Sequence, residues 1–284
     1  MNYFHVDVFS AKPLSGNGLT VIFPDKPLSS QTHLEIAQEF KQMESIFVFP
    51  STEAGYPVRI FTVEEELEFA GHPVLGAAAV IHKCFYSSQK TADINLMLDK
   101  RRIHLQSQFF SDHYNVIMNQ GTPEFLSVVS PKYYTDIASS LNVDSSALND
   151  DYPVEVVSTG LPYLLVPLKE NLDKAKISIS NFGEFISQFR AKFVYVFNPE
   201  TLQCRTWNNS GTIEDIATGS AAGPLCAYLV KNGFKKSNEL ISISQGQYLN
   251  RPSIIKGWVS NINMKQEVFI KGDVSFFGSG EINI

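Results

Sequence analysis

The chain has 284 residues, enough for two domains of ordinary size with a core each. Its net charge of −6 leaves no basic surface for nucleic acid, and no apolar run approaches the length of about 18 residues that a membrane-spanning helix needs. The start lacks the basic and apolar regions of a signal peptide, and Cys84, Cys204 and Cys226 are too few and too widely spaced for a disulfide framework, so we expect a cytoplasmic protein without nucleic-acid or membrane partners.

The first half of the sequence alternates strands with two helices. Strand-like runs occupy residues 3–9, 19–23, 44–49 and 58–62, and two or three more are expected between residues 94 and 118. Ser30 is the expected N-cap of a helix over residues 31–40. A glycine-containing turn at residues 68–73 then begins an Ala-rich helix over residues 74–81. Pro73 suits the first helical position, which makes His72 the expected N-cap.

The second half begins after a cluster of turn residues at 120–123. Expected strands lie at residues 154–158, 163–168, 193–197, 203–207, 240–244, 253–259, 268–271, 274–277 and 281–284, and expected helices at 133–141 and 179–192. A second glycine turn, residues 214–223, precedes an apolar helix over residues 224–230. Thr218 or Ser220 can cap this helix, and Gly233 is its expected stop.

The two halves echo each other in the order of their elements. The strand that holds Arg59 corresponds to the strand that holds Arg205, and the first glycine turn with its helix corresponds to the second. Neither helix is amphipathic, so each is expected inside a sheet. We therefore expect one domain over residues 1–120 and a second over 121–272, with the last strand, 273–284, returning to the first. Both helix N-termini would then face one cleft, where an anion is favoured.

Glu44 is the first candidate for chemistry because it stands between a helix and an apolar strand. A carboxylate that is partly desolvated in such a place has a raised pKa, as a general acid or base requires. The alternative is a solvated glutamate at the start of a strand, which is the commoner situation for this residue type.

Three further polar residues lie in the glycine turns. His72 can bind a substrate carboxylate or carry a proton, or it can simply cap and pack its helix. Asp215 can orient His72 or Glu44 or hold a polar group of a ligand, and Ser220 can bind an anion together with the amides of Gly219 and Ala221. The alternative for this turn is a well-capped helix with acidic residues favoured by its dipole. The six histidines show no zinc-type spacing, so no metal is expected.

Several short phrases together resemble the phenazine-biosynthesis (PhzF-like) isomerase family. They follow the family's order and cover essentially the whole chain: residues 6–9, 15–17, 44–45, 58–62, 69–73, 158–163, 214–221 and 250–253. The resemblance implies an α+β fold similar to diaminopimelate epimerase, with two pseudo-repeated domains. Each would be a curled, mostly antiparallel sheet around a central helix, with the active site between the two domains. Gly18 and Ile216 stand where the family often has proline, and this removes no functional group.

The resemblance also implies the roles of residues. The residues matching Glu44, His72, Asp215 and Ser220 line the site of the phenazine enzyme, in which the glutamate moves a proton along the substrate without a cofactor. Gly71 and the amides of the second turn would bind the substrate. Epimerases of this fold use one cysteine from each domain. The turns here carry none, so a two-thiol mechanism is disfavoured.

The sequence therefore predicts a cofactor-independent isomerase that acts on a small carboxylate-bearing molecule, with Glu44 as general acid and base. Two alternatives remain open: a racemase or epimerase that uses Glu44 and His72 instead of thiols, and a binding or scaffold protein that has kept the fold without turnover. The resemblance implies a homodimer. It does not carry over the substrate or the pathway.

Overall fold

The computed structural model describes residues 1–99, 101–262 and 265–284. The chain divides into two compact units. Unit 1 comprises Met1–Asn119, Arg251–Ile254 and Lys271–Ile284, and unit 2 comprises Gln120–Asn250 and Ile255–Ile270. The short segment Arg251–Ile254 thus belongs to unit 1 although the chain on both sides of it belongs to unit 2.

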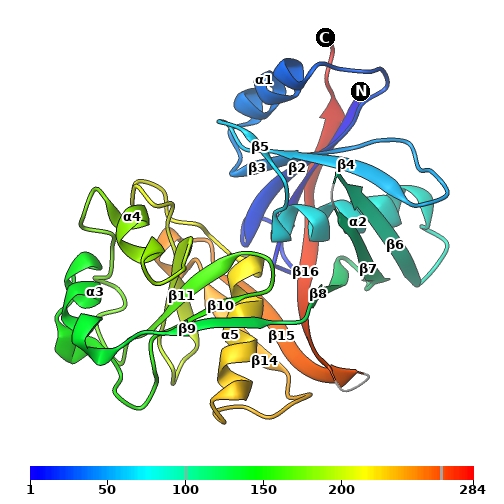
Figure 1. Ribbon diagram of the computed structural model, residues 1–284. Coiled ribbons are helices and arrows are strands. Elements are labelled where there is room, and N and C mark those ends of the chain that lie inside the picture. Colours follow the sequence, from blue (N-terminus) through cyan, green and yellow to red (C-terminus); the bar gives the residue numbers. More distant parts are fainter. Residues whose placement is uncertain (100, 263–264) are drawn as a thin grey trace. The chain divides into compact units, whose positions relative to one another are not determined.

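Unit 1 is built from strands with two helices (Figure 1). Its elements are β1 (Asn2–Val8), β2 (Asn17–Phe23), α1 (Ser30–Phe40), β3 (Glu44–Val48), β4 (Tyr56–Phe61), β5 (Glu66–Leu67), α2 (Gly71–Phe85), β6 (Thr91–Leu98), β7 (Arg101–Phe109), most of β8 (Tyr114–Gly121) and the second part of β16 (Lys265–Glu281).

The sheet of unit 1 closes on itself. Its strand order is β1-β2-β3-β4-β6-β7-β8-β16, and β16 also pairs with β1, where Val8 lies opposite Val274 and Asn2 opposite Glu281. The pairs β1–β2 and β3–β4 are antiparallel, whereas β2–β3 and β4–β6 are parallel. Both chain ends lie on this sheet, where the Ile282 amide donates to the Met1 carbonyl.

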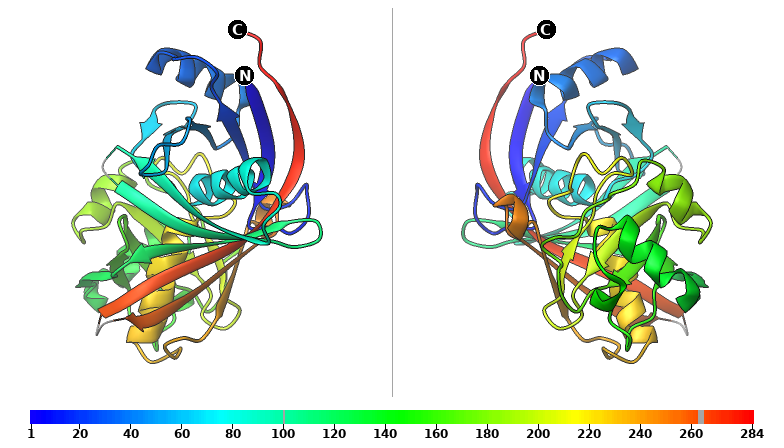
Figure 2. Two further views of the ribbon diagram at one scale, coloured as in Figure 1. Left: turned by 90° about the vertical axis from the view of Figure 1, so that its right-hand side faces the viewer. Right: turned by 90° about the vertical axis from the view of Figure 1, so that its left-hand side faces the viewer.

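Helix α2 forms the core of unit 1. It packs against β1, β2, β3, β6 and β7, and the views in Figure 2 show it among these strands. Every residue from Gly71 to His82 is buried. Small and apolar residues on all faces allow this, because a helix that is apolar all round is stable only when it is surrounded. Burial of each large side chain, such as Leu75, contributes on the order of 1.5–3 kcal/mol.

Unit 2 repeats this plan. Its elements are β9 (Glu124–Val128), η1 (Pro131–Tyr133), α3 (Tyr134–Ser140), η2 (Ser145–Ala147), β10 (Glu155–Ser158), β11 (Pro162–Pro167), α4 (Phe182–Ser187), β12 (Phe193–Phe197), β13 (Gln203–Arg205), α5 (Gly219–Lys231), β14 (Ile241–Gln245), η3 (Gln247–Leu249), most of β15 (Ser253–Ile262) and the first part of β16.

The strands of unit 2 follow the order β9-β10-β11-β12-β13-β14-β15-β16. Here β10–β11 and β12–β13 are antiparallel, and β11–β12 and β13–β14 are parallel. The central helix is α5, which packs on β10 and β11 and is buried from Ala221 to Leu229. In both units the central helix precedes the strand that completes the second parallel pair. The predicted α+β class, with a curled sheet around a central helix in each repeat, is confirmed.

Some predicted helix starts are wrong by one or two residues. Ser29, not Ser30, caps α1, where its hydroxyl accepts from the Thr32 amide at 3.0 Å. Helix α2 begins at Gly71 and its N-cap is Ala70, so His72 lies inside the first turn. Pro73 occupies a later position of that turn, where its missing N–H again has no helical partner to lose. The predicted stop of α5 is correct: Gly233 follows the C-cap Asn232 with a φ of 78°.

Among the residues that the structure describes, no helix has both the length and the apolar content needed to cross a membrane.

Candidate functional site

Glu44 and His72 meet in unit 1. Glu44 is the first residue of β3, and parallel pairing with β2 places it beside Leu19. His72 lies in the first turn of α2. Its Nε2 atom is 3.3 Å from Oε2 of Glu44, and the two side chains are 5% and 17% exposed. The predicted base and the predicted histidine, which are far apart in the sequence, are therefore in contact.

The His72 imidazole is uncharged at neutral pH. Burial lowers its pKa to about 3, because desolvation penalises the charged form. The 3.3 Å distance to Glu44 is short enough for an ion pair, but a neutral ring cannot form one. The contact is therefore one between a carboxylate and a neutral imidazole.

Asn17 contacts the other nitrogen of the same ring. Its Nδ2 atom lies 3.4 Å from Nδ1 of His72, and the side chain of Asn17 is fully buried. Asn17 begins β2 directly after Gly16, whose φ of 74° suits a residue without a side chain. In the sequence Asn17 stands out only as part of the resemblance, and its contact with His72 could not be found from a spacing.

The first turn of α2 carries the predicted binding residue Gly71. The N-cap Ala70 makes no side-chain capping bond to the helix. The dipole of this 15-residue helix is positive at Gly71 and His72, so a negatively charged group is favoured there. The Glu44 carboxylate and the start of α2 are thus neighbours in unit 1.

In unit 2 the turn before α5 is held by a buried glutamine. The Asp215 carboxylate accepts from the Thr218 hydroxyl at 2.5 Å. Gln245 is fully buried and donates to the Asp215 carbonyl at 2.9 Å, and its Oε1 accepts from the Thr218 amide at 3.1 Å. Thr218 occupies the N-cap position, but its hydroxyl bonds Asp215 rather than a helix amide. Gln245 ends an alternating strand, and no local pattern distinguishes it.

The predicted binding residues of this turn have partners within unit 2. The Ser220 hydroxyl lies 2.8 Å from the Tyr163 hydroxyl. The Ala221 amide donates to the Thr218 carbonyl at 3.1 Å. The Gly219 carbonyl accepts from the Gln120 amide at 2.9 Å. The assignment of Asp215 to catalysis and of Gly219, Ser220 and Ala221 to substrate binding stays a prediction.

In each unit an arginine–glutamate ion pair holds the segment before the central helix in place. Arg59 on β4 donates to both carboxylate oxygens of Glu66, at 2.7 and 2.5 Å. Arg205 on β13 donates to both oxygens of Glu214, each at 2.7 Å. The correspondence of Arg59 and Arg205 in sequence therefore reflects the same contact in both units.

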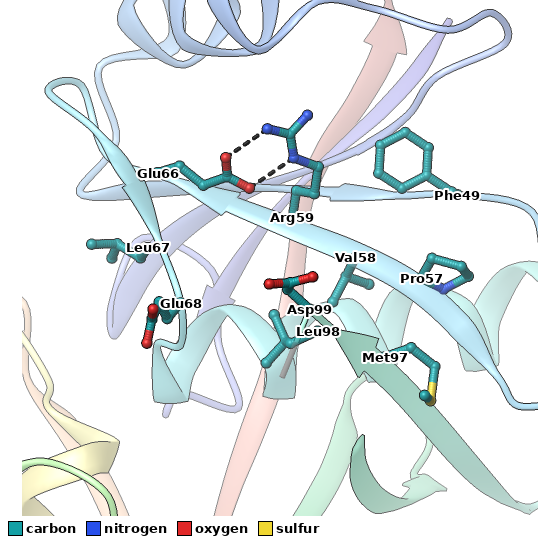
Figure 3. Close-up of a pocket in the computed structure, with 10 residues that line it drawn as sticks. All are labelled: Phe49, Pro57, Val58, Arg59, Glu66, Leu67, Glu68, Met97, Leu98 and Asp99. Atoms are coloured by element: carbon teal, nitrogen blue, oxygen red, sulfur yellow. Dashed lines mark hydrogen bonds and ion pairs between the residues drawn. The ribbon is translucent and has the colours of Figure 1, made fainter. Parts of the chain in front are cut away.

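A pocket of about 720 Å³ lies elsewhere in unit 1 (Figure 3). It is lined by Phe49, Pro57, Val58, Arg59, Glu66, Leu67, Glu68, Met97, Leu98 and Asp99. Neither Glu44 nor His72 is among these residues, and the Arg59–Glu66 pair neutralises two of the charged groups. The contact between Glu44 and His72, whose pKa is strongly perturbed, is therefore a separate candidate for the chemistry.

The three cysteines are unsuited to proton transfer. Burial raises the pKa of the Cys226 thiol to about 12 and that of Cys204 well above its ordinary value. The pKa of Cys84, near the end of α2, is also raised by burial. A thiol with a raised pKa is a poor source of the thiolate that acts as a base. This agrees with the prediction that a two-thiol mechanism is disfavoured.

Comparison with known proteins identifies the same family from sequence and from structure. The family model of phenazine biosynthesis-like proteins matches residues 6–280. The chain is 28% identical over 297 residues to trans-2,3-dihydro-3-hydroxyanthranilate isomerase of Pseudomonas chlororaphis, with 99% of both chains covered.

Solved structures extend the comparison to the fold. A predicted epimerase from Pseudomonas aeruginosa matches with a TM-score of 0.92 and 35% identity, over 100% of this chain and 99% of that one. A probable proline racemase from Agrobacterium radiobacter K84 matches with a TM-score of 0.64 and 10% identity, over 100% and 93% of the two chains, which is a likeness of fold alone. The predicted family and the epimerase-like architecture are confirmed. The chain belongs to the phenazine biosynthesis-like (PhzC-PhzF) family, and it is an isomerase.

Proposed function

We propose that this isomerase moves a proton between carbon atoms of a small carboxylate-bearing substrate, with Glu44 as the general base and then the general acid. The observation that carries the proposal is the contact between Glu44 and His72 at 3.3 Å, in a site where the imidazole is neutral. A cationic neighbour would weaken the carboxylate as a base far more than the N–H of a neutral ring does.

The reaction needs no change of oxidation state. Glu44 takes a proton from carbon, the electron pair of that C–H bond shifts into the substrate's π system, and the protonated Glu44 returns the proton to a second carbon. The negative charge that develops would be stabilised by hydrogen-bond donors that are already in place. The N–H of His72 and the positive end of α2, in whose first turn His72 lies, are candidates for this role.

The start of α2 has no side-chain cap, and a helix N-terminus favours an anion. This supports a substrate that carries a carboxylate. A carboxylate bound there would lie within reach of the Glu44 base. The name of the Pseudomonas chlororaphis relative suggests trans-2,3-dihydro-3-hydroxyanthranilate, a cyclic amino acid, as the first probe. The predicted roles of Asp215 and of the amides of Gly219 and Ala221 in holding substrate belong to the same proposal.

The test is exchange of substrate protons in D₂O. The substrates tested are a panel of cyclic carboxylates that includes trans-2,3-dihydro-3-hydroxyanthranilate. We expect the native protein to incorporate deuterium into this compound or into another member of the panel. Glu44→Gln keeps the shape of the side chain, but it replaces one carboxylate oxygen with an NH₂ group and cannot accept a proton. We expect its exchange rate to fall by roughly 10²- to 10⁴-fold, the usual contribution of a general base.

Glu35→Gln is the matched control, because Glu35 is an exposed residue of α1 whose carboxylate accepts from the amide of Gln31 on the same helix. Exchange should be unchanged in this variant. Full exchange by Glu44→Gln would exclude Glu44 as the base. If a carboxylate raises the melting temperature of the native protein but none of the panel exchanges, a binding protein is the better explanation.

A racemase or epimerase is the second candidate, and it is favoured by the likeness to the predicted epimerase from Pseudomonas aeruginosa. Such an enzyme would place the deuterium on the original carbon with inverted configuration. An isomerase of the proposed kind would place it on a different carbon. Chiral analysis of the product from the same D₂O experiment therefore separates the two.

A further inference from the structure

The His72 ring lies between two polar side chains that differ in hydrogen-bonding capacity. Asn17 Nδ2 lies 3.4 Å from Nδ1, and Glu44 Oε2 lies 3.3 Å from Nε2. Asn17 and His72 are 0% and 4% exposed, so little solvent is available to replace either contact. The proton of the neutral ring can lie on only one of the two nitrogens.

The chemistry of the two neighbours selects one tautomer. An amide NH₂ group only donates, so the nitrogen that faces it must carry a lone pair. The proton then lies on Nε2, directed at the Glu44 carboxylate, which only accepts. In the opposite tautomer an N–H would face the NH₂ group, and a lone pair would face the carboxylate. Both contacts would then be repulsive in a buried site.

The turn that carries Asn17 is held by an ion pair between partly exposed Arg251 and buried Asp7. Arg251 donates to Asp7 Oδ1 at 2.6 Å and to the Gly16 carbonyl at 2.9 Å. The other oxygen of Asp7 accepts from the Leu14 amide at 2.8 Å. Asp7 is 2% exposed. Leu14 and Gly16, which precede Asn17, are thus fixed, and this restricts the freedom of Asn17 to turn away from His72.

We propose that Asn17 is a positioning residue that keeps the His72 proton on Nε2, facing Glu44. This inference rests on the proposed function of Glu44 as the base. Asn17 acts through His72 and does not touch the reacting atoms. Held by Asn17, the His72 ring presents its N–H to the Glu44 carboxylate and later to the developing charge.

The tautomer can be measured directly by NMR of protein labelled with ¹⁵N-histidine. We expect His72, assigned with His72→Gln, to show a protonated Nε2 and an unprotonated Nδ1. Two other histidines serve as references in the same spectrum. His82 Nε2 lies 3.0 Å from the Gln89 carbonyl, which requires the same tautomer. His33 Nδ1 lies 2.8 Å from the Ser29 carbonyl, which requires the opposite one.

Asn17→Asp replaces the donor by an acceptor of similar shape. We expect the His72 signals to change to the pattern of His33, while the signals of His82 stay unchanged and show that the fold is retained. Asn17→Ala removes the donor without adding charge and should give an averaged pattern, and it decides the question if Asn17→Asp does not fold. A native His72 protonated on Nδ1, or a pattern unaltered in both variants, would overturn the proposal.

The same variants are then compared by deuterium exchange with trans-2,3-dihydro-3-hydroxyanthranilate or the exchanging carboxylate of the panel. We expect a loss of roughly 10- to 100-fold, the range found for partners that orient a functional histidine. A changed tautomer with unchanged exchange would exclude a positioning role for Asn17 and leave Glu44 as the base. Exchange that survives in Glu44→Gln would overturn the proposed function instead, since the NMR result does not depend on turnover.

Discussion

In both units an arginine–glutamate pair precedes the central helix, but the two pairs are buried to different extents. In unit 1 the side chains of Arg59 and Glu66 are 29% and 42% exposed. In unit 2 those of Arg205 and Glu214 are 9% and 10% exposed. Arg205 also donates to the carbonyls of Leu172, Asp173 and Ala175, at 2.8 to 2.9 Å.

This difference shows that topology decides where such a pair stands and that burial decides its energetic weight. An exposed ion pair contributes little because water screens and competes for both charges. Removal of one partner of a buried pair leaves a charge without compensation, which is costly. The stability of unit 2 therefore depends on its arginine–glutamate pair far more than that of unit 1 does, although the bidentate geometry is the same in both.

The largest expected effect is that of Arg205→Met. It leaves Glu214 buried without its partner and removes the donor to three carbonyls, so we expect the free energy of unfolding of unit 2 to fall by about 3–5 kcal/mol. Both tryptophans, Trp207 and Trp258, lie in unit 2, so fluorescence in a urea titration reports this unit. A change below about 1 kcal/mol would show that the buried pair does not stabilise the protein more than the exposed pair does.

A glycine in each central helix allows a second comparison. A Cβ at Gly76 would overlap the side chain of Leu19, and one at Gly223 would overlap the amide oxygen of Gln120. We expect Gly76→Ala and Gly223→Ala each to cost about 1–3 kcal/mol through overpacking. Only Gly223→Ala should disturb the bond from Gln120 to Gly219, which is measurable as faster hydrogen exchange at the start of α5. Equal exchange in both variants would contradict this.

The pH dependence of stability isolates His72 of unit 1. Its pKa is lowered to about 3 in the folded protein, whereas an unfolded histidine titrates near about 6.5. The unfolded chain therefore binds the additional proton between these values. The free energy of unfolding should fall by up to about 1.4 kcal/mol per pH unit as pH decreases below about 6, and the effect should vanish above pH 6.5.

His72→Gln should remove this part of the slope when urea unfolding, followed by circular dichroism, is compared at pH 7 and at pH 4.5. Burial also lowers the pKa values of His5 and His33, and these contribute equally to both proteins. The difference between the slopes therefore belongs to His72. Equal slopes would mean that folding does not lower the pKa of His72.

The smallest effect is expected for Arg59→Met, the counterpart of Arg205→Met. Because its pair with Glu66 is half exposed, we expect a loss of no more than about 1 kcal/mol. Hydrogen exchange of the α2 amides, which lie in unit 1, gives the measurement. A loss as large as that of Arg205→Met would show that exposure does not explain the difference between the units.

Periodicity and composition were sufficient to predict both central helices. The runs after Gly71 and Gly219 are apolar on every face, so their burial inside a sheet follows from local sequence. The exact start of α2 did not follow, because Ala70 becomes the N-cap without offering a capping side chain. His72 was therefore expected as the N-cap, whereas it is the second residue of the helix.

The candidate site was predictable only in part, because its contacts depend on sheet register. Glu44 and His72 could be named from their settings, but Asn17 reaches His72 across 55 residues of sequence through the pairing of β1, β2 and β3. Gln245 reaches Thr218 in the same way in unit 2. Such partners carry no local signal, since a one-residue shift of register would replace them with their neighbours.

The strand that closes unit 1 also sets the order in which this protein can fold during synthesis. Residues 274–281 form the last strand that pairs with β1, and Arg251 forms the ion pair with Asp7. Nascent unit 1 therefore leaves the ribosome with an open edge and a turn that is not yet fixed, and it must wait for these late residues. Synthesis adds about 5–20 residues per second, so an interval of seconds or more separates the first strand from its final neighbour, during which the open edge can pair wrongly.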